Sequence, residues 1–179
     1  MDKLLIATTN EHKIKEIAAI FAEAGITDWE IIGLNNFPDY QPPEEDGQTF
    51  AENAMIKALA AAKMSGLLTL ADDSGLTVEA LNGEPGVYSN MQDIPDGNRQ
   101  AAFVCAAALA TPEEEAFFLE GRCEGEIAHE ERGSNGFGYD CLFYLPQLGK
   151  TMAELDEEEK NAISHRGAAM RKIAQIIKK

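Results

Sequence analysis

Two adjacent carboxylates, Asp72 and Asp73, follow the apolar run LLTLA (67–71) and precede Ser74-Gly75. Successive side chains of an extended strand face opposite sides, so we expect only one of these aspartates to enter a cleft. That carboxylate could hold a metal ion and deprotonate a water molecule, and a divalent cation nearby would keep both acids ionised. The other could accept hydrogen bonds from a turn that Gly75 allows. The pair therefore predicts one chemical and one structural aspartate at the end of a strand.

Residues 8–13 are a candidate phosphate-binding turn, because a strand ends and a helix begins within them. The six residues are Thr8, Thr9, Asn10, Glu11, His12 and Lys13. The free N–H groups of a helix start suit an anion, and Lys13 lies about one turn into the helix. For this stretch alone, the commoner alternative is that Asn10 only caps the helix and Lys13 is solvated.

Lys57 and an acidic loop at 42–47 are two further candidates. On a helix, Lys57 shares a face with Asn53 and Ala61 and is not on a wholly polar stripe, although a surface lysine with a buried stem would have the same pattern. The loop, PPEEDG, contains Glu45 among three acids. These acids either favour the positive end of the next helix or supply a ligand to a hard divalent cation. The residues alone leave these alternatives open.

Apolar runs and helical repeats alternate along the chain, which predicts an α/β fold with helices on a mixed sheet. We expect strands at 3–9, 29–34, 67–71, 99–110, 116–128 and 139–146. We expect helices at 11–25, 49–63, 151–159 and 164–179. Thr49 and Glu52 have capping-box spacing, and Ser164 is the expected N-cap of the last helix.

Length, charge and cysteine usage narrow the class of protein. The chain has 179 residues, 45% of them hydrophobic, and no linker-like stretch, so we expect a single domain over residues 1–179. Its formal net charge of −16 repels polyanions, which excludes nucleic acid and anionic membranes as main partners. Three scattered cysteines without a CxxC motif suit a reducing compartment, and no apolar run reaches transmembrane length. We therefore expect a cytoplasmic protein.

Six blocks, in order along nearly the whole chain, resemble the inosine triphosphate pyrophosphatase family. They are ATTNEHKIKEI (7–17), TFAENAMIKA (49–58), LADDSGL (70–76), GEPGVYS (83–89), GFGYDCLF (136–143) and AELDEEEKNAISHRGAAM (153–170). The resemblance implies an elongated mixed β-sheet flanked by helices, with two lobes around a central cleft, and a homodimer. It also implies magnesium-dependent hydrolysis of non-standard purine nucleoside triphosphates (ITP, dITP and XTP) to nucleoside monophosphate and pyrophosphate. A catalytically silent nucleotide-binding protein of the same fold is the alternative.

The same resemblance implies roles for individual residues. Asp73 is the implied metal ligand and proton acceptor, Glu45 the second magnesium ligand, and Lys57 a catalytic lysine that faces the phosphates. The implied substrate-binding residues are Thr8, Thr9, Asn10, Glu11, His12, Lys13, Ser74, Phe137, Gly138, Tyr139, Asp140, Lys160, His165 and Arg166. Phe137 is placed to stack on the base, and Lys13 is expected to act with Lys57 in offsetting charge on the phosphates.

His165 and Arg166 fall in the first turn of the last expected helix, where hydrogen-bond donors cluster. A 6-oxo purine presents an acceptor at this edge, whereas adenine presents an amino donor. Adenine would leave a pocket donor unpaired, which costs roughly 1–3 kcal/mol per buried group. This arrangement predicts discrimination against ATP.

The chain departs from the family pattern at two places. NMQDIPDGN (90–98) leads directly from Ser89 to the next strand, where family members carry a further helix of several turns, and Cys141 replaces a proline. None of the implied catalytic positions lies in the missing segment, so the resemblance still implies an enzyme.

Overall fold

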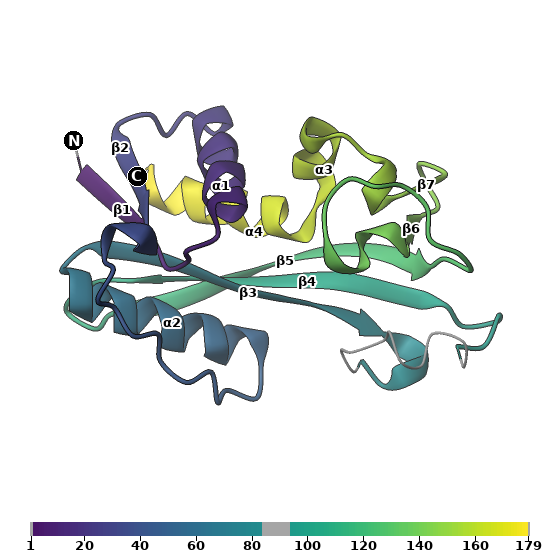
Figure 1. Cartoon of the computed structure of the whole chain (residues 1–179), viewed down its shortest axis with the longest axis horizontal. Coiled ribbons are helices and arrows are strands. Elements are labelled where there is room, and N and C mark those ends of the chain that lie inside the picture. Colours follow the sequence, from purple (N-terminus) through teal and green to yellow (C-terminus); the bar gives the residue numbers. More distant parts are fainter. Residues whose placement is uncertain (1, 84–93, 179) are drawn as a thin grey trace.

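The computed structural model describes residues 2–83 and 94–178, which form one mixed sheet with helices on both faces (Figure 1). Across the sheet the strands are β2 (Trp29–Gly33), β1 (Asp2–Ile6), β3 (Leu68–Val78), β4 (Gln100–Ala110), β5 (Ala116–Ile127), β6 (Phe143–Leu145) and β7 (Lys150–Thr151). β1 runs parallel to β2 and β3, and the pairs from β3 to β7 are antiparallel. The expected α/β class is confirmed.

The helices divide between the two faces of the sheet. They are α1 (Glu11–Glu23), α2 (Phe50–Ser65), α3 (Glu157–Ile163) and α4 (His165–Ile177). Figure 1 shows α1, α3 and α4 on one face and α2 on the other. The long strands β3, β4 and β5 run between two lobes, one with α1, α2, β1 and β2 and the other with α3, β6 and β7.

Local capping chemistry starts three of these helices where the sequence predicts it. Asn10 accepts hydrogen bonds from the first turn of α1. Thr49 and Glu52 form the capping box of α2, and Ser164 caps α4. These side chains satisfy N–H groups that have no partner inside the helix, which explains why the helix starts can be read from the chain.

The two faces of the sheet are packed with side chains of different size. Large residues such as Leu4, Phe21 and Met170 fill the core below α1 and α4. One group of buried residues, between α2 and strands β3 and β4, consists of alanines: Ala54, Ala58, Ala62, Ala71, Ala106, Ala108 and Ala110. Short side chains let α2 approach the sheet closely, and this brings the polar side chains of α2 within reach of β3.

β3 has one edge that is only partly paired. β1 pairs with β3 as far as Leu70, whereas β4 pairs along β3 to Val78, and beyond Leu70 no described strand pairs with the first edge. The Leu70 carbonyl accepts a hydrogen bond from the Ala7 N–H at 2.8 Å on this edge. Alternate residues of a strand direct their main-chain groups to the same edge, so Asp72 and Ser74 present theirs to the gap between the lobes.

The expectation that a strand ends at the two aspartates is wrong. β3 continues through Asp72 and Asp73 to Val78, because β4 pairs with it residue by residue. Gly75 lies inside β3 and makes no turn. A side chain at Gly75 would collide with the ring of Phe50, so glycine here allows α2 and β3 to approach closely.

Two expected elements in the second lobe also differ. Only Phe143–Leu145 of the expected strand 139–146 is a strand, because Gly138–Cys141 forms a 3₁₀ turn. The expected helix at 151–159 is replaced by β7, a 3₁₀ turn and α3, because Thr151 pairs with β6.

Two further expectations concern the connection at 90–98 and membrane-spanning segments. Of the shortened connection at 90–98, residues 90–93 lie outside the described residues. None of the described helices has the length and apolar character to cross a membrane.

Candidate functional site

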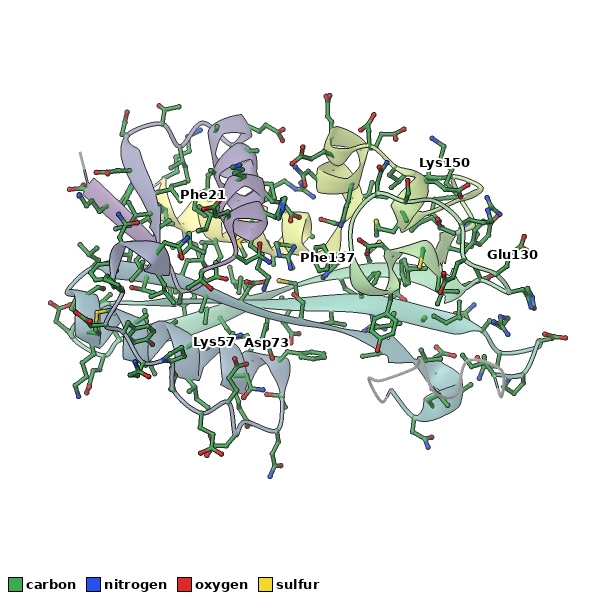
Figure 2. All side chains as sticks on the ribbon, in the orientation of Figure 1. Phe21, Lys57, Asp73, Glu130, Phe137 and Lys150 are labelled. Atoms are coloured by element: carbon green, nitrogen blue, oxygen red, sulfur yellow. The ribbon has the colours of Figure 1, made fainter. Side chains whose placement is uncertain are left out.

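Asp73, Lys57 and Glu45 meet on the α2 side of the sheet. Lys57 Nζ lies 3.2 Å from Asp73 Oδ1 and 3.3 Å from Glu45 Oε2. Figure 2 shows Lys57 and Asp73 next to each other, one from α2 and one from β3. Both side chains keep about one-fifth of their surface exposed (18% and 21%), so a small ligand can reach them.

The loop that carries Glu45 is tied to the start of α2. The Gly47 N–H donates to Asn53 Oδ1 at 2.8 Å, and the Gln48 N–H donates to Glu52 Oε2 at 2.6 Å. These bonds, together with the ion pair to Lys57, hold the acidic loop beside β3.

The two carboxylates that pair with Lys57, those of Glu45 and Asp73, form an oxygen donor set that fits a hard divalent metal ion. Oxygen ligands suit Mg²⁺, which is usually held by one or two carboxylates together with waters and substrate phosphates. Within the described residues no three acidic, histidine or cysteine side chains gather into a larger metal cluster. Glu45 and Asp73 would therefore supply two ligands and leave the remaining positions to water and phosphate.

Asp72 lies on the opposite face of β3 and is buried, with 5% of its surface exposed. Its carboxylate accepts from Lys13 Nζ (3.2 and 3.3 Å), Arg166 Nε (3.1 Å) and Ser74 Oγ (3.4 Å). The expectation that Asp72 accepts hydrogen bonds from a turn at Gly75 is wrong, because the strand continues and two cations take the carboxylate instead.

The ionised form of Asp72 is strongly favoured. Burial alone raises the pKa of this carboxyl, but the charges of Arg166 and Lys13 and their hydrogen bonds outweigh burial and lower its pKa to about 2. Arg166 also pairs with Glu16 of α1, whose Oε2 lies 2.9 Å from its Nη1. The buried cluster therefore contains two cations and two carboxylates.

The candidate phosphate turn lies at the start of α1, where the expected Asn10 cap is confirmed and the expected solvated Lys13 is wrong. Asn10 caps the helix, with its Oδ1 accepting from the His12 and Lys13 N–H groups at 3.0 and 3.3 Å. The Thr8 hydroxyl accepts from the Asn10 N–H at 3.2 Å. Lys13 is not solvated, because its ammonium is paired with Asp72 and only 23% of its side chain is exposed. Thr9, Glu11 and His12 are exposed.

A cavity of about 320 Å³ lies beside the open edge of β3. Eight of the expected substrate-binding residues line it: Ser74, Phe137, Gly138, Tyr139, Asp140, Lys160, His165 and Arg166. The other four lining residues are Phe50, Gly75, Leu76 and Phe103. Its walls are mainly apolar and aromatic, and a few polar side chains converge on it. Such a lining is typical of a site for a small aromatic ligand.

His165 is a buried imidazole in this cavity. Its ring stacks on Phe103 with 4.8 Å between centroids, and 8% of its surface is exposed. Burial, followed by the charges of Arg166 and Lys160, lowers its pKa to about 3, so the ring is neutral at pH 7. Among the described residues His165 Nδ1 has no hydrogen-bond partner.

Phe137 is the exposed aromatic side chain of the site, with 58% of its surface open. Its N–H donates to Asp140 Oδ2 at 3.0 Å, and Lys160 Nζ donates to the same oxygen at 2.8 Å. The Lys160 ammonium lies 4.9 Å from the centre of the Phe137 ring and the Arg166 guanidinium 6.0 Å from it. Asp140 and Lys160 thus hold the turn that presents the ring.

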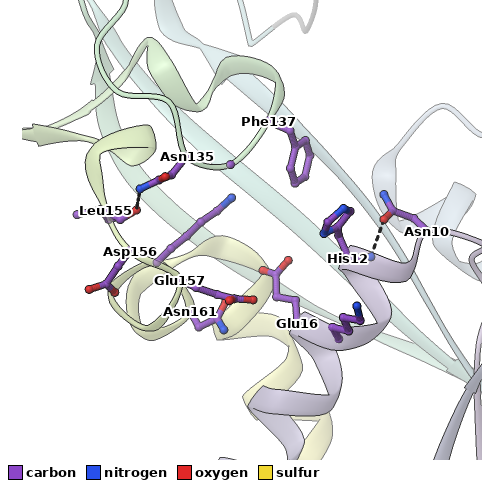
Figure 3. Close-up of a pocket in the computed structure, with 12 residues that line it drawn as sticks. Asn10, His12, Glu16, Asn135, Phe137, Leu155, Asp156, Glu157 and Asn161 are labelled. Carbon is purple, nitrogen blue, oxygen red and sulfur yellow. Dashed lines mark hydrogen bonds between the residues drawn. The ribbon is translucent and has the colours of Figure 1, made fainter.

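A second, larger cavity of about 750 Å³ lies between α1 and α3 (Figure 3). Figure 3 shows Asn10, His12 and Glu16 on one side and residues of the second lobe, including Asp156 and Glu157, on the other. Phe137 and Lys160 line both cavities, so the two cavities adjoin at these side chains.

Sequence reasoning missed Glu16, Phe50 and Phe103. Glu16 lies three positions after Lys13 on α1, so helical spacing could have placed it on the same face. Phe103 lies opposite Leu76 in the strand ladder, and only the pairing of β3 with β4 reveals this. Phe50 reaches β3 because Gly75 leaves room for its ring.

Comparison with known proteins gives consistent matches. The model of the Ham1 family matches residues 4–176. A dITP/XTP pyrophosphatase of Desulforamulus reducens is 44% identical over 194 residues, covering 98% of this chain and 95% of the relative. A dITP/XTP pyrophosphatase of Bacillus cereus is 42% identical over 198 residues, covering 99% and 95%. These aligned lengths exceed the 179 residues of the chain, as expected if the chain lacks a segment that its relatives carry.

Solved structures agree with the fold. A HAM1 protein from Coxiella burnetii is similar with a TM-score of 0.88 and 39% identity, covering 99% of both chains. The Ham1 protein of Staphylococcus aureus is similar with a TM-score of 0.85 and 39% identity, covering 99% of this chain and 98% of that one.

Proposed function

The chain belongs to the Ham1 family, and on this premise we propose that it hydrolyses ITP, dITP and XTP to the nucleoside monophosphate and pyrophosphate. The observation that carries the proposal is the meeting of Glu45, Lys57 and Asp73 next to an aromatic cavity. A silent nucleotide-binding protein would not need two carboxylates and a lysine kept together and accessible.

The triphosphate lies across the open edge of β3 in this proposal. Lys13 reaches this edge from one face of the sheet and Lys57 from the other. The main-chain groups of Asp72 and Ser74 point to the same gap. Two cations on opposite sides would offset the charge that grows on the phosphates as the bond between the α- and β-phosphates breaks.

Asp73 is the proposed proton acceptor. It would orient a water molecule, take its proton as the oxygen attacks phosphorus, and release the proton after pyrophosphate leaves. Glu45 and Asp73 are the proposed ligands of Mg²⁺, which, when bound, would neutralise phosphate charge. Lys57 then faces the phosphates from beside the two carboxylates.

Base recognition is proposed for the aromatic cavity. Phe137 offers an exposed ring for stacking, and His165 and Arg166 line the wall behind it. An N–H donor of the His165 and Arg166 wall would pair with a 6-oxo group, whereas the amino group of adenine offers such a donor no acceptor there. An unpaired buried group costs roughly 1–3 kcal/mol, which supports selection against ATP.

The experiment is a panel of nucleoside triphosphates with magnesium, with pyrophosphate and orthophosphate measured separately. We expect pyrophosphate from ITP, dITP and XTP and much slower turnover of ATP. Orthophosphate as the sole product, or equal rates with ATP, would contradict the proposal.

A homodimer is part of the proposal and rests on the family resemblance alone. Light scattering coupled to size-exclusion chromatography should give about twice the 19.5 kDa mass of one chain. A mass of one chain at micromolar concentration would contradict it.

A further inference from the structure

Asp72 is one buried carboxylate that contacts three residues expected to bind substrate. Lys13 belongs to the phosphate turn on α1, Arg166 to the base cavity on α4, and Ser74 to the open edge of β3. Arg166 follows Asp72 by 94 positions in the chain, and Lys13 precedes it by 59. A single side chain thus joins the two ends of the proposed nucleotide site.

We infer that Asp72 is a positioning residue that fixes Lys13 and Arg166 relative to each other, and so couples recognition of the triphosphate to recognition of the base. The inference rests on the proposed function, because it assigns these two cations to the two ends of a nucleotide. It differs from the role expected from the sequence, which was structural support of a turn.

Access separates Asp72 from the groups that touch substrate. Its side chain is 2% exposed, so it does not itself reach a ligand in the cleft. The Lys13 side chain is 23% exposed and can contact a phosphate while it stays near Asp72. Arg166 is 4% exposed but lines the base cavity. The effect of Asp72 on substrate must therefore pass through its partners.

Arg166 is held at two points. Its Nε donates to Asp72 at 3.1 Å and its Nη1 to Glu16 at 2.9 Å. A guanidinium has five N–H groups in a rigid plane, so two anchors fix its orientation and still leave donors for a ligand. Removal of one anchor leaves the plane free to turn about the other.

The charges in this cluster are balanced, with Lys13 and Arg166 against Asp72 and Glu16. If Asp72 becomes asparagine, a buried excess of positive charge remains and the two cations repel each other. Lys13 then moves toward solvent and Arg166 loses its second anchor. Phosphate binding and base selection should fail together, although the substituted side chain touches neither.

The experiment measures the two ends separately in the full chain by calorimetry with magnesium present. Inorganic tripolyphosphate probes the phosphate end and inosine probes the base end. In Asp72→Asn we expect both dissociation constants to rise at least about tenfold, the size of a hydrogen bond to a charged group. The ratio of kcat/KM for ITP over ATP should fall by a similar factor, mainly through KM.

A matched control separates positioning from stability. Ile26 is buried just after α1, at the opposite end of that helix from Lys13, so Ile26→Ala lowers the melting temperature through a cavity. Assayed well below both melting temperatures, this variant should keep wild-type binding of both probes and the wild-type ITP:ATP ratio. Lys13→Met should weaken tripolyphosphate binding and leave that of inosine nearly unchanged.

The double variant Lys13→Met/Asp72→Asn removes one charge of each sign, so it should fold even if Asp72→Asn does not. We expect its inosine affinity and ITP:ATP ratio to be about tenfold below those of Lys13→Met alone. The inference is overturned if Asp72→Asn has the inosine affinity and ITP:ATP ratio of wild type. If Asp72→Asn does not fold, it is overturned when the double variant has the inosine affinity and ITP:ATP ratio of Lys13→Met. If the wild-type chain binds neither probe, both the proposed function and the inference are contradicted. If it binds both probes, the variants test the positioning role alone.

Discussion

Asp72 and Asp73 are neighbours in β3, yet the two faces of the strand give the same side chain opposite surroundings. Asp72 is buried and held by two cations, and its pKa is lowered to about 2. Asp73 is one-fifth exposed and shares a single lysine with Glu45. The comparison teaches that the number of cations and the access to solvent, rather than the residue type, decide which carboxylate a ligand in the cleft can reach.

The largest expected effect is on turnover, and it comes from Asp73 on the exposed face of β3. Asp73→Asn should cut turnover of ITP by at least ~10²–10⁴-fold, because general-base help is lost and a metal ligand is weakened. The protein should remain folded and should still bind ITP, as measured by circular dichroism and calorimetry. Glu130→Gln removes an exposed carboxylate in the second lobe and should leave turnover unchanged. Full activity of Asp73→Asn would reverse the assignment of the two aspartates.

The ionisation of buried Asp72 should make the free energy of unfolding depend on pH. The pKa of Asp72 falls from 3.8 to about 2 on folding, so its contribution is complete above about pH 4 and is lost as the pH falls through 2. At 1.36 kcal/mol per pKa unit this amounts to about 2–3 kcal/mol. The difference in unfolding free energy between wild type and Asp72→Asn, measured by urea at pH 6 and pH 2.5, should therefore shrink at the lower pH.

Glu114→Gln makes the same chemical change in an exposed ion pair with Lys63 and is the control for this measurement. Its unfolding midpoint should match wild type at both pH values, because exposed pairs are screened by water. A constant Asp72→Asn difference across the range would mean that the folded chain does not favour the ionised carboxylate.

The smallest expected effect concerns the metal. Glu45→Gln should weaken the apparent affinity for magnesium about tenfold, since one of two anionic ligands becomes neutral. The preference for ITP over ATP should not change, because Glu45 lies on the far face of β3 from Arg166. Titration of activity with magnesium, and of manganese binding by calorimetry, measures the affinity. Full activity of wild type in excess chelator would contradict a metal role for Glu45 and Asp73.

Local chemistry made part of this structure predictable. The caps at Asn10, Thr49 and Ser164 act within three residues of themselves, so their sequence is enough to place the helix starts. The alternation of side chains in a strand correctly separated Asp72 from Asp73, although the strand was expected to end there. The roles of Glu45, Lys57 and Asp73 came from the resemblance to a family and stay predictions.

Pairing between segments distant in the chain determines the features that the sequence did not predict. β4 extends β3 past the aspartates, and β6 recruits Thr151 into a strand where a helix was expected. The partners of Asp72 are also distant in the chain, since Arg166 comes from the last helix. The sequence Asp-Asp-Ser-Gly (72–75) favours a turn locally, but the free energy of strand pairing and of two ion pairs outweighs that preference.

The continuity of β3, β4 and β5 through both lobes limits how the cleft can move. A hinge concentrates rotation in a few loop residues, whereas here the connection between the lobes is a ladder of paired strands. A wide rotation of one lobe against the other would break hydrogen bonds in this ladder. The sheet is therefore stiff to bending between the lobes and allows only a slight twist along the strands. The separation between the α1 and α3 sides of the cleft is therefore largely set when the strands pair, before any nucleotide arrives.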